Sequence, residues 1–317
     1  MKILSTVKRI PGGMMVVPLL LGATINTFFP QFFELGGFTE ALFKTGATAI
    51  LAAFLFANGA QISVKQAGKP LYKGTALLIS KLLLGGLLGV LVNALFGPMG
   101  LLGITPLAII AALTNSNGGL FAALGGQYGD ATDVGVVSII ALNDGPFLTM
   151  LVLGATGLAS VPFTALIATL VPILIGFILG NLDDDIRVFL KPATSILIPF
   201  FAFPLGAGLN FSQLITAGFS GVLLGVITTV VTGFGGYYTY KLIKADHPYV
   251  GAAIGTTAGN AVGTPAALAA IDPSISEIAG IATAQVAAAI IVTAILTPLL
   301  VSWLYKNHKA KAEGATS

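Results

Sequence analysis

Cysteine is absent from this 317-residue sequence, and charged residues make up only 9% of it. Without cysteine, the chain has no disulfides, no thiolate chemistry and no cysteine-based metal site. A soluble domain is about 25% charged, so a surface this poor in charge does not suit water. The net charge of +3 is small and gives no indication of a nucleic-acid partner.

The chain is instead 56% hydrophobic, in runs long enough to cross a bilayer. A spanning helix needs about 20 mostly apolar residues. The basic N-terminal segment runs directly into the first run, so no cleaved signal peptide is expected. We predict an all-α integral membrane protein with ten transmembrane helices. The predicted spans are residues 12–30, 39–59, 71–96, 104–126, 132–156, 161–180, 190–209, 216–243, 249–270 and 274–304.

The basic residues predict the orientation of these spans. If the N-terminus lies in the cytoplasm, every Lys and Arg except Lys44 and Lys81 lies in a cytoplasmic terminus or loop, or at the cytoplasmic end of a span. The opposite loops carry acidic residues, among them Glu34 and Asp272. This positive-inside bias is typical of a multi-pass protein of the cell inner membrane, here with both termini cytoplasmic.

The two halves of the chain, residues 1–158 and 159–317, resemble each other. Residues 17–22 (VPLLLG) match 171–176 (VPILIG), and 119–124 (GLFAAL) match 263–268 (GTPAAL), in the same order. Each half holds five predicted spans, an odd number, so the second half must be inverted relative to the first. Inverted repeats are typical of transporters that bind substrate near the middle of the membrane.

Two of the predicted spans are interrupted by poor helix formers. Residues 114–119 (TNSNGG) interrupt the fourth span, and residues 256–265 (TTAGNAVGTP) interrupt the ninth. Glycine costs about 1 kcal/mol inside a helix, and irregular backbone at membrane depth is tolerated where it lines a watery cavity. We therefore predict discontinuous helices 4 and 9 that cross at the centre, with half-helix N-termini facing an anion.

The polar residues of these breaks are the predicted substrate-binding residues. They are Asn115, Ser116, Asn117, Gly118, Gly119, Thr256, Thr257, Asn260 and Thr264. An alternative is that the small residues only permit close helix packing. That alternative accounts for scattered glycines such as Gly85 and Gly89, but not for two asparagines that flank Ser116.

Asp144 lies halfway along the fifth span, and a carboxylate at that depth marks a functional site by default. It could take up and release a proton, or it could only cap the helix that restarts at Gly145-Pro146. Lys81, deep in the third span, could pair with Asp144, meet an anionic substrate or snorkel to the cytoplasm. Asn143 and Gln285 hold corresponding places in spans 5 and 10, where they support coupling or bond neighbouring helices.

Three stretches resemble the bacterial 2-keto-3-deoxygluconate permease family: residues 8–14 (KRIPGGM), 113–119 (LTNSNGG) and 140–146 (IALNDGP). The resemblance covers essentially the whole chain. It implies a proton symporter, without cofactors, that imports the small anionic sugar acid 2-keto-3-deoxygluconate. The family is similar in fold to bile acid/sodium symporters, which implies a panel domain of spans 1, 2, 6 and 7 and a core domain of spans 3–5 and 8–10.

Bile-acid-type sodium sites use an acidic residue at the second break, but residues 255–270 contain neither Asp nor Glu. Proton coupling through Asp144 is therefore favoured over sodium, although sodium coupling or another organic anion stays open as an alternative. An intramembrane enzyme is disfavoured. A membrane aspartyl protease needs two deep carboxylates, but only Asp144 lies deep, with Asp130 and Asp133 near a loop. A metalloenzyme needs clustered ligands, but the two histidines, His247 and His308, both lie outside the spans.

Overall fold

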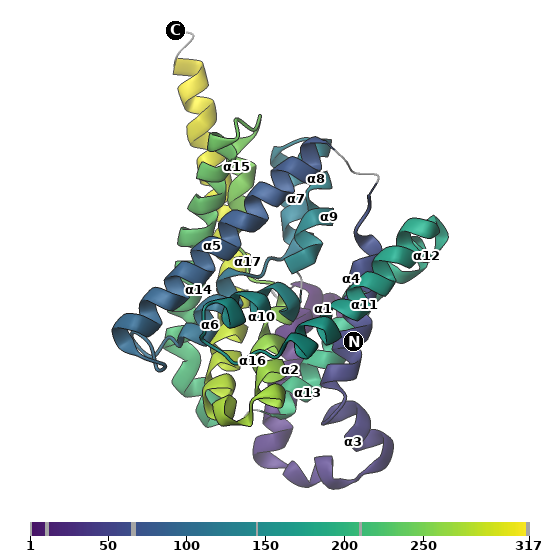
Figure 1. Ribbon diagram of the computed structural model, residues 1–317. Helices are drawn as coiled ribbons and strands as arrows, with labels where there is room; N and C mark the ends of the chain where they lie inside the picture. Colours follow the sequence, from purple (N-terminus) through teal and green to yellow (C-terminus); the bar gives the residue numbers. More distant parts are fainter. Residues whose placement is uncertain (1, 10–12, 65–67, 144, 209–210, 315–317) are drawn as a thin grey trace.

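The computed structural model describes the chain except residues 1, 10–12, 65–67, 144, 209–210 and 315–317, and the described part contains helices and no strand (Figure 1). The first half contains α1 (Ile3–Arg9), α2 (Gly13–Phe28), η1 (Pro30–Glu34), α3 (Gly37–Phe43), α4 (Ala47–Gln61), α5 (Lys69–Phe96), α6 (Pro106–Leu113), α7 (Gly118–Tyr128), α8 (Ala131–Gly135), α9 (Val137–Ile140), η2 (Ala141–Asn143) and α10 (Pro146–Ala155). The second half contains α11 (Phe163–Leu182), α12 (Asp184–Leu190), α13 (Ala193–Ala207), α14 (Phe211–Leu242), α15 (Pro248–Gly251), η3 (Ala252–Ile254), η4 (Gly259–Val262), α16 (Gly263–Ile271), η5 (Pro273–Ile275) and α17 (Ser276–Gly314).

The helices are long and apolar enough for a membrane protein. Within the described residues, five helical stretches could each cross a bilayer, and the number rises to nine if each of four bent helix pairs is one span. The sequence predicted ten. The remaining predicted span is the segment from α15 to α16, whose helical pieces are too short to qualify.

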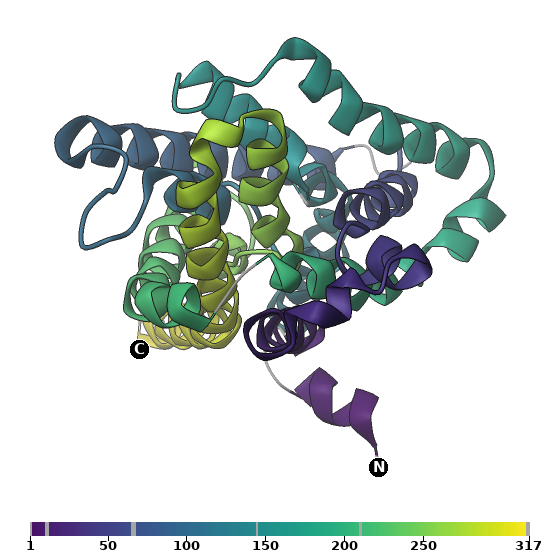
Figure 2. The same cartoon turned by 90° about the horizontal axis from the view of Figure 1, so that it is seen from below.

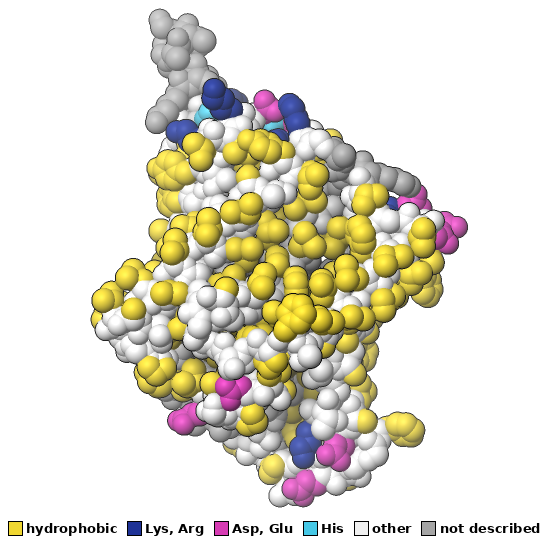
Figure 3. Space-filling model, viewed as in Figure 1, with side chains coloured by type: hydrophobic (Ala, Val, Ile, Leu, Met, Phe, Trp, Pro, Cys, Tyr) yellow, Lys and Arg dark blue, Asp and Glu magenta, His cyan; other side chains and the backbone are white. Residues whose placement is uncertain are grey.

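The surface of the molecule is apolar around its middle. Figure 3 shows hydrophobic side chains over most of the face in view, with Lys and Arg gathered at one end and Asp and Glu with few basic neighbours at the other. Large exposed side chains such as Leu87, Phe163 and Ile178 contribute to this surface. Apolar groups on this scale suit contact with lipid rather than water.

One group of helices, α2, α4, α11 and α13, packs through glycines that let backbones touch. A Cβ at Gly22 of α2 would overlap α13, and a Cβ at Gly206 of α13 would overlap α2. Gly59 of α4 and Gly176 of α11 form an equivalent pair, since a Cβ at either glycine would overlap the backbone of the other helix. Small residues allow such close packing between helices in membranes.

Replacing Gly176 by alanine is expected to lower the melting temperature in detergent, because the new methyl group would overlap the Phe56 carbonyl oxygen. Overpacking of this kind costs about 1–3 kcal/mol. Gly218 of α14 is the matched control, since a Cβ there has no neighbour within 4 Å. Gly218→Ala should leave stability unchanged or raise it slightly. Equal melting temperatures for the two variants would contradict this packing.

The second group contains α5, α6, α7, α14, α16 and α17, and α14 runs beside α17 in both views (Figures 1 and 2). Both predicted breaks lie in this group. Helix α6 ends at Leu113 and α7 restarts at Gly118, with a bend of 45° between them. The second break is shorter than predicted: it spans residues 255–258, and helix resumes at Gly259. Pro265 lies in the first turn of α16, where its missing N–H is tolerated.

The C-terminal segment differs from its prediction. The sequence of the basic tail, residues 306–317, predicts a solvated and disordered segment, but in the structure α17 continues to Gly314. The segment contains good helix formers such as Lys309, Ala310 and Glu313, which extend an existing helix at little cost. The predicted disorder is therefore wrong for residues 306–314, whereas the exposure of residues 306–310 agrees with a solvated tail, and residues 315–317 lie outside the described part.

Candidate substrate site

A cavity of about 600 Å³ lies between the two groups of helices. Its walls come from α4, α7, the α8–α9 region, the start of α13 and the second break. The volume falls in the range of small-molecule sites. Of the predicted substrate residues, four line the cavity: Asn117, Gly118, Gly119 and Asn260.

The N-terminus of α7 forms one wall of the cavity. Asn117 caps this helix, because its side-chain Oδ1 accepts a hydrogen bond from the Leu120 N–H at 2.9 Å. Gly118 and Gly119 follow as the first helical residues, so their N–H groups have no carbonyl one turn earlier to bind within the helix. The positive end of the helix dipole also lies here. This wall can bind a carboxylate.

Asn260 lines the cavity with an amide that has no partner. Its side-chain nitrogen and oxygen are both buried without a hydrogen bond within the described residues, and the residue is only 2% exposed. A buried polar group in this condition is rare, because leaving it unpaired costs about 1–3 kcal/mol. Both polar atoms are covered in this conformation, so the Asn260 amide can donate to and accept from a bound hydroxyl group once its side chain turns toward the cavity.

The two breaks contact each other directly. The Asn117 N–H donates to the Thr256 hydroxyl at 2.9 Å, and the Thr257 hydroxyl donates to the Ala112 carbonyl at 3.1 Å. Thr256 and Thr257 are thus used in joining the breaks and do not line the cavity.

The other predicted substrate residues, Asn115, Ser116 and Thr264, are buried outside the cavity lining. Asn115 donates to the Gly145 carbonyl at 3.3 Å, and Ser116 accepts a hydrogen bond from the Asn143 side chain at 3.0 Å. The Thr264 hydroxyl is buried without a partner within the described residues. Asn115 and Ser116 therefore stabilise the first break, and Thr264 lies in α16, beyond the second break.

Asn143 and Gln285 occupy different surroundings, although the sequence placed them in corresponding positions. The Asn143 side chain donates to the Thr114 carbonyl at 3.1 Å as well as to Ser116 at the first break. Gln285 instead accepts hydrogen bonds from Thr105, at the start of α6, and donates to Ser220 of α14. In α17 the second break is bound by Thr293, which accepts from the Thr257 N–H at 3.1 Å, and by Thr297, which donates to the Gly255 carbonyl at 2.8 Å.

Lys81 does not snorkel to the surface, as one reading of the sequence suggested. The residue is 1% exposed, and its Nζ donates to the backbone carbonyls of Ile254 at 2.5 Å and Thr256 at 2.6 Å. It therefore binds the second break from α5. Asp144, its alternative predicted partner, lies outside the described residues.

The wall opposite α7 contains residues that the sequence reasoning missed. The C-cap of α12 contributes Lys191, the first turn of α13 contributes Thr194 and Ser195, and α4 contributes Asn58 and Gln61. One signal was present: Asn58 and Gln61 are three residues apart, so they share a face at the end of an apolar helix. Their position opposite the breaks depends on tertiary packing.

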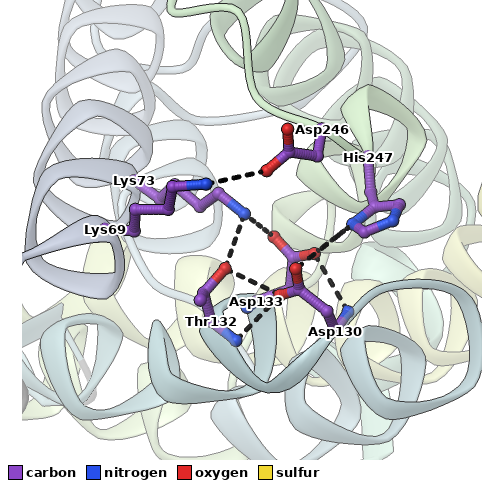
Figure 4. A network of polar contacts seen from close by, with 7 residues as sticks. All are labelled: Lys69, Lys73, Asp130, Thr132, Asp133, Asp246 and His247. Carbon is purple, nitrogen blue, oxygen red and sulfur yellow. Dashed lines mark hydrogen bonds and ion pairs between the residues drawn. The ribbon is translucent and has the colours of Figure 1, made fainter.

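A cluster of charged residues joins α5, α8 and the start of α15 at one end of the molecule (Figure 4). Asp133 is fully buried, and Lys73 Nζ and His247 Nδ1 approach its carboxylate from two sides at 2.7 and 2.8 Å. The Thr132 hydroxyl bonds to Asp130 and lowers the pKa of this carboxyl to about 2. Asp130, Asp133 and His247 are spaced closely enough to surround a metal ion, but the Lys73 ammonium already neutralises Asp133.

Comparisons with known proteins show the family of this chain. The model of the 2-keto-3-deoxygluconate permease family matches residues 4–310. The chain is 52% identical to 2-keto-3-deoxygluconate permease 1 of Salmonella typhimurium over 312 residues, 98% of each chain. It is 42% identical to the 2-keto-3-deoxygluconate permease of Bacillus subtilis over 319 residues, covering 98% of this chain and 96% of the relative. These names are those of transporters and not of enzymes.

Proposed function

Because this chain belongs to the 2-keto-3-deoxygluconate permease family, we propose that it imports 2-keto-3-deoxy-D-gluconate across the inner membrane by proton symport. The main support for the proposal is the cavity lined by the N-terminus of α7 and by Asn260, whose amide has no hydrogen-bond partner within the described residues. A sugar acid needs one site for its carboxylate and several partners for its hydroxyl groups.

The substrate carboxylate binds at the N–H groups of Gly118 and Gly119, where the helix dipole favours an anion. The hydroxyl groups bind Asn260 on one wall and Ser195 with Thr194 on the other, all of which line the cavity. Lys191 adds positive charge to the same wall. Since the substrate contacts both groups of helices, movement of one group relative to the other changes the shape of the binding site.

The fold that we propose is a ten-helix inverted repeat with a panel domain (α2, α4, α11, α13) and a core domain (α5–α10, α14–α17). The glycine contacts support it. Gly22 and Gly176 occupy matching positions in the two repeats, and each contacts the other repeat in the same way: Gly22 against Gly206 and Gly176 against Gly59. A two-fold relation between the halves produces this reciprocal pairing.

Alternating access follows from the two domains moving around the central site. The cavity extends from the breaks to Gln61 and Lys191, at span ends that the charge bias places in the cytoplasm, as it does both chain termini. The conformation described is therefore inward-facing in our proposal.

Uptake of labelled 2-keto-3-deoxygluconate into proteoliposomes tests this function. An acidic exterior is expected to drive accumulation, whereas a sodium gradient at equal pH is not. Accumulation driven by sodium alone, or saturable uptake of other organic anions but not of this one, would contradict the proposal. Both outcomes would instead support the sodium-coupled or other-anion alternative.

Replacing Asp144 by asparagine is expected to abolish accumulation driven by the pH gradient, because the amide cannot release a proton in the accessible range. The same variant should still exchange external for internal substrate, which requires no net proton transfer. Asp185→Asn, on the exposed helix α12, is the control and should accumulate substrate normally. Full pH-driven accumulation by Asp144→Asn would remove Asp144 from the coupling mechanism.

A further inference from the structure

The Lys81 ammonium lies against the end of a helical segment inside the protein. Its two acceptors, the carbonyl oxygens of Ile254 and Thr256, lie on either side of Gly255, where η3 ends and the chain leaves helical conformation. The last carbonyls of a helix have no partner within the helix and carry the negative end of its dipole. A positive charge is favoured at this position.

We propose that these carbonyl oxygens form a monovalent-cation site and that the Lys81 ammonium is its resident, covalently tethered cation. Carbonyls exposed at unwound helices are the ligands that coordinate sodium in secondary transporters. An ammonium is likewise a compact charge, and its three donors can bind several such oxygens. Lys81 is thus a positioning residue for the second break rather than a residue that contacts substrate.

A short chain of contacts connects this cation site to the substrate cavity. The Thr256 carbonyl oxygen accepts a hydrogen bond from Lys81, and the Thr256 hydroxyl accepts one from the Asn117 N–H. Asn117 in turn caps α7 and lines the cavity. The cation therefore holds in place the residue that orients the anion-binding helix end, and its charge also favours an anion nearby in the low-dielectric interior.

Lys73, which lies eight residues earlier on the same helix, does not compete for this site. Lys73 is bound to Asp133 at 2.7 Å, about 12 Å of helix away from Lys81. Helix α6, which packs against α5, contains no ionisable residue at all. Asp144 lies outside the described residues, and the proposal does not depend on its position.

The inference rests on the proposed function, because one readout is binding of 2-keto-3-deoxygluconate. Lys81→Ala vacates the carbonyl site and is expected to weaken binding by about 5- to 150-fold, the usual range for coupled sites. Sodium or methylammonium should restore the affinity and raise the melting temperature of this variant, whereas choline is too large to enter. Wild-type protein should bind equally well in sodium and in choline.

Two matched variants separate charge from packing. Lys81→Met fills the space without a charge, so sodium and methylammonium should not rescue it, while Lys81→Arg keeps the charge and should bind substrate without added cations. A folded Lys81→Ala protein that no small cation stabilises would overturn the proposal, as would a sodium requirement in the wild type. If the wild type fails to bind the sugar acid, the proposed function fails, but cation-dependent melting of Lys81→Ala still tests the cation site.

Discussion

Replacing Asn260 by alanine is expected to weaken binding of 2-keto-3-deoxygluconate by about 10- to 100-fold without destabilising the empty protein. A site that provides hydrogen bonds to a substrate hydroxyl loses about 1.4–2.8 kcal/mol when they are removed. The same substitution removes a buried amide whose two polar atoms have no partner within the described residues. Stability should therefore stay equal or rise, a pattern typical of residues kept for function.

Asn181→Ala is the matched control for Asn260→Ala. The Asn181 amide donates to the carbonyls of Ile62 and Phe177, and its oxygen accepts from the Val64 N–H, so it is fully used in joining α11 to the end of α4. Its removal should lower the melting temperature while leaving substrate affinity unchanged. Titration calorimetry and thermal unfolding in detergent measure both quantities. Unchanged affinity in Asn260→Ala would remove this residue from the substrate site.

Breaking the buried ion pair between Lys73 and Asp133 is expected to have the largest effect on stability. Side-chain exposure is 4% for Lys73 and 0% for Asp133, so without Asp133 the buried Lys73 charge has no counter-ion, and without Lys73 the Asp133 carboxylate keeps only His247 beside it. Removing one partner of such a pair costs about 3–5 kcal/mol. Asp133→Asn and Lys73→Met should each lower the melting temperature strongly, and the double variant should recover much of the loss.

The exposed pair between Lys69 and Asp246 provides the control for this cycle. Its atoms are 3.3 Å apart, but the side chains are 68% and 55% exposed, so Asp246→Asn should cost less than about 1 kcal/mol. If Asp133→Asn costs no more than Asp246→Asn, then Asp133 does not hold α5, α8 and the start of α15 together in the membrane. Thermal unfolding of all variants under one detergent condition makes the comparison.

The central features of the site could be predicted from sequence because their signal is local. Asparagines and glycines inside an apolar window interrupt a helix wherever it packs, so Asn117 and Asn260 were identified from composition and spacing alone. The ionic cluster was not foreseen, because Asp133 reads as a loop residue and its partner His247 is 114 residues away in the sequence. Likewise, the acceptors of Lys81 are backbone carbonyls, which no residue pattern indicates.

The correspondence between Asn143 and Gln285 shows a second limit. Both repeats consist largely of Ala, Gly, Leu and Thr, so aligning one repeat on the other fixes the register only approximately. If the second repeat is shifted by about two helical turns in this alignment, Asn143 corresponds to Thr293 instead of Gln285, and Thr293 contacts the second break. The panel wall of the cavity was also beyond sequence reasoning, because Ser195 and Lys191 face the breaks only once two groups of helices have packed together.

Substrate protection of a single cysteine shows whether the sugar acid occupies this cavity, since the natural chain has no cysteine to interfere. Ser195→Cys places a thiol in the cavity, on an exposed residue of the wall opposite Asn260, and Asp185→Cys places one on α12 outside it. In inside-out vesicles, which expose the cytoplasmic side, a membrane-impermeant maleimide is expected to label both thiols, and 2-keto-3-deoxygluconate is expected to protect Ser195→Cys alone. Equal labelling of Ser195→Cys with and without saturating substrate would contradict this expectation.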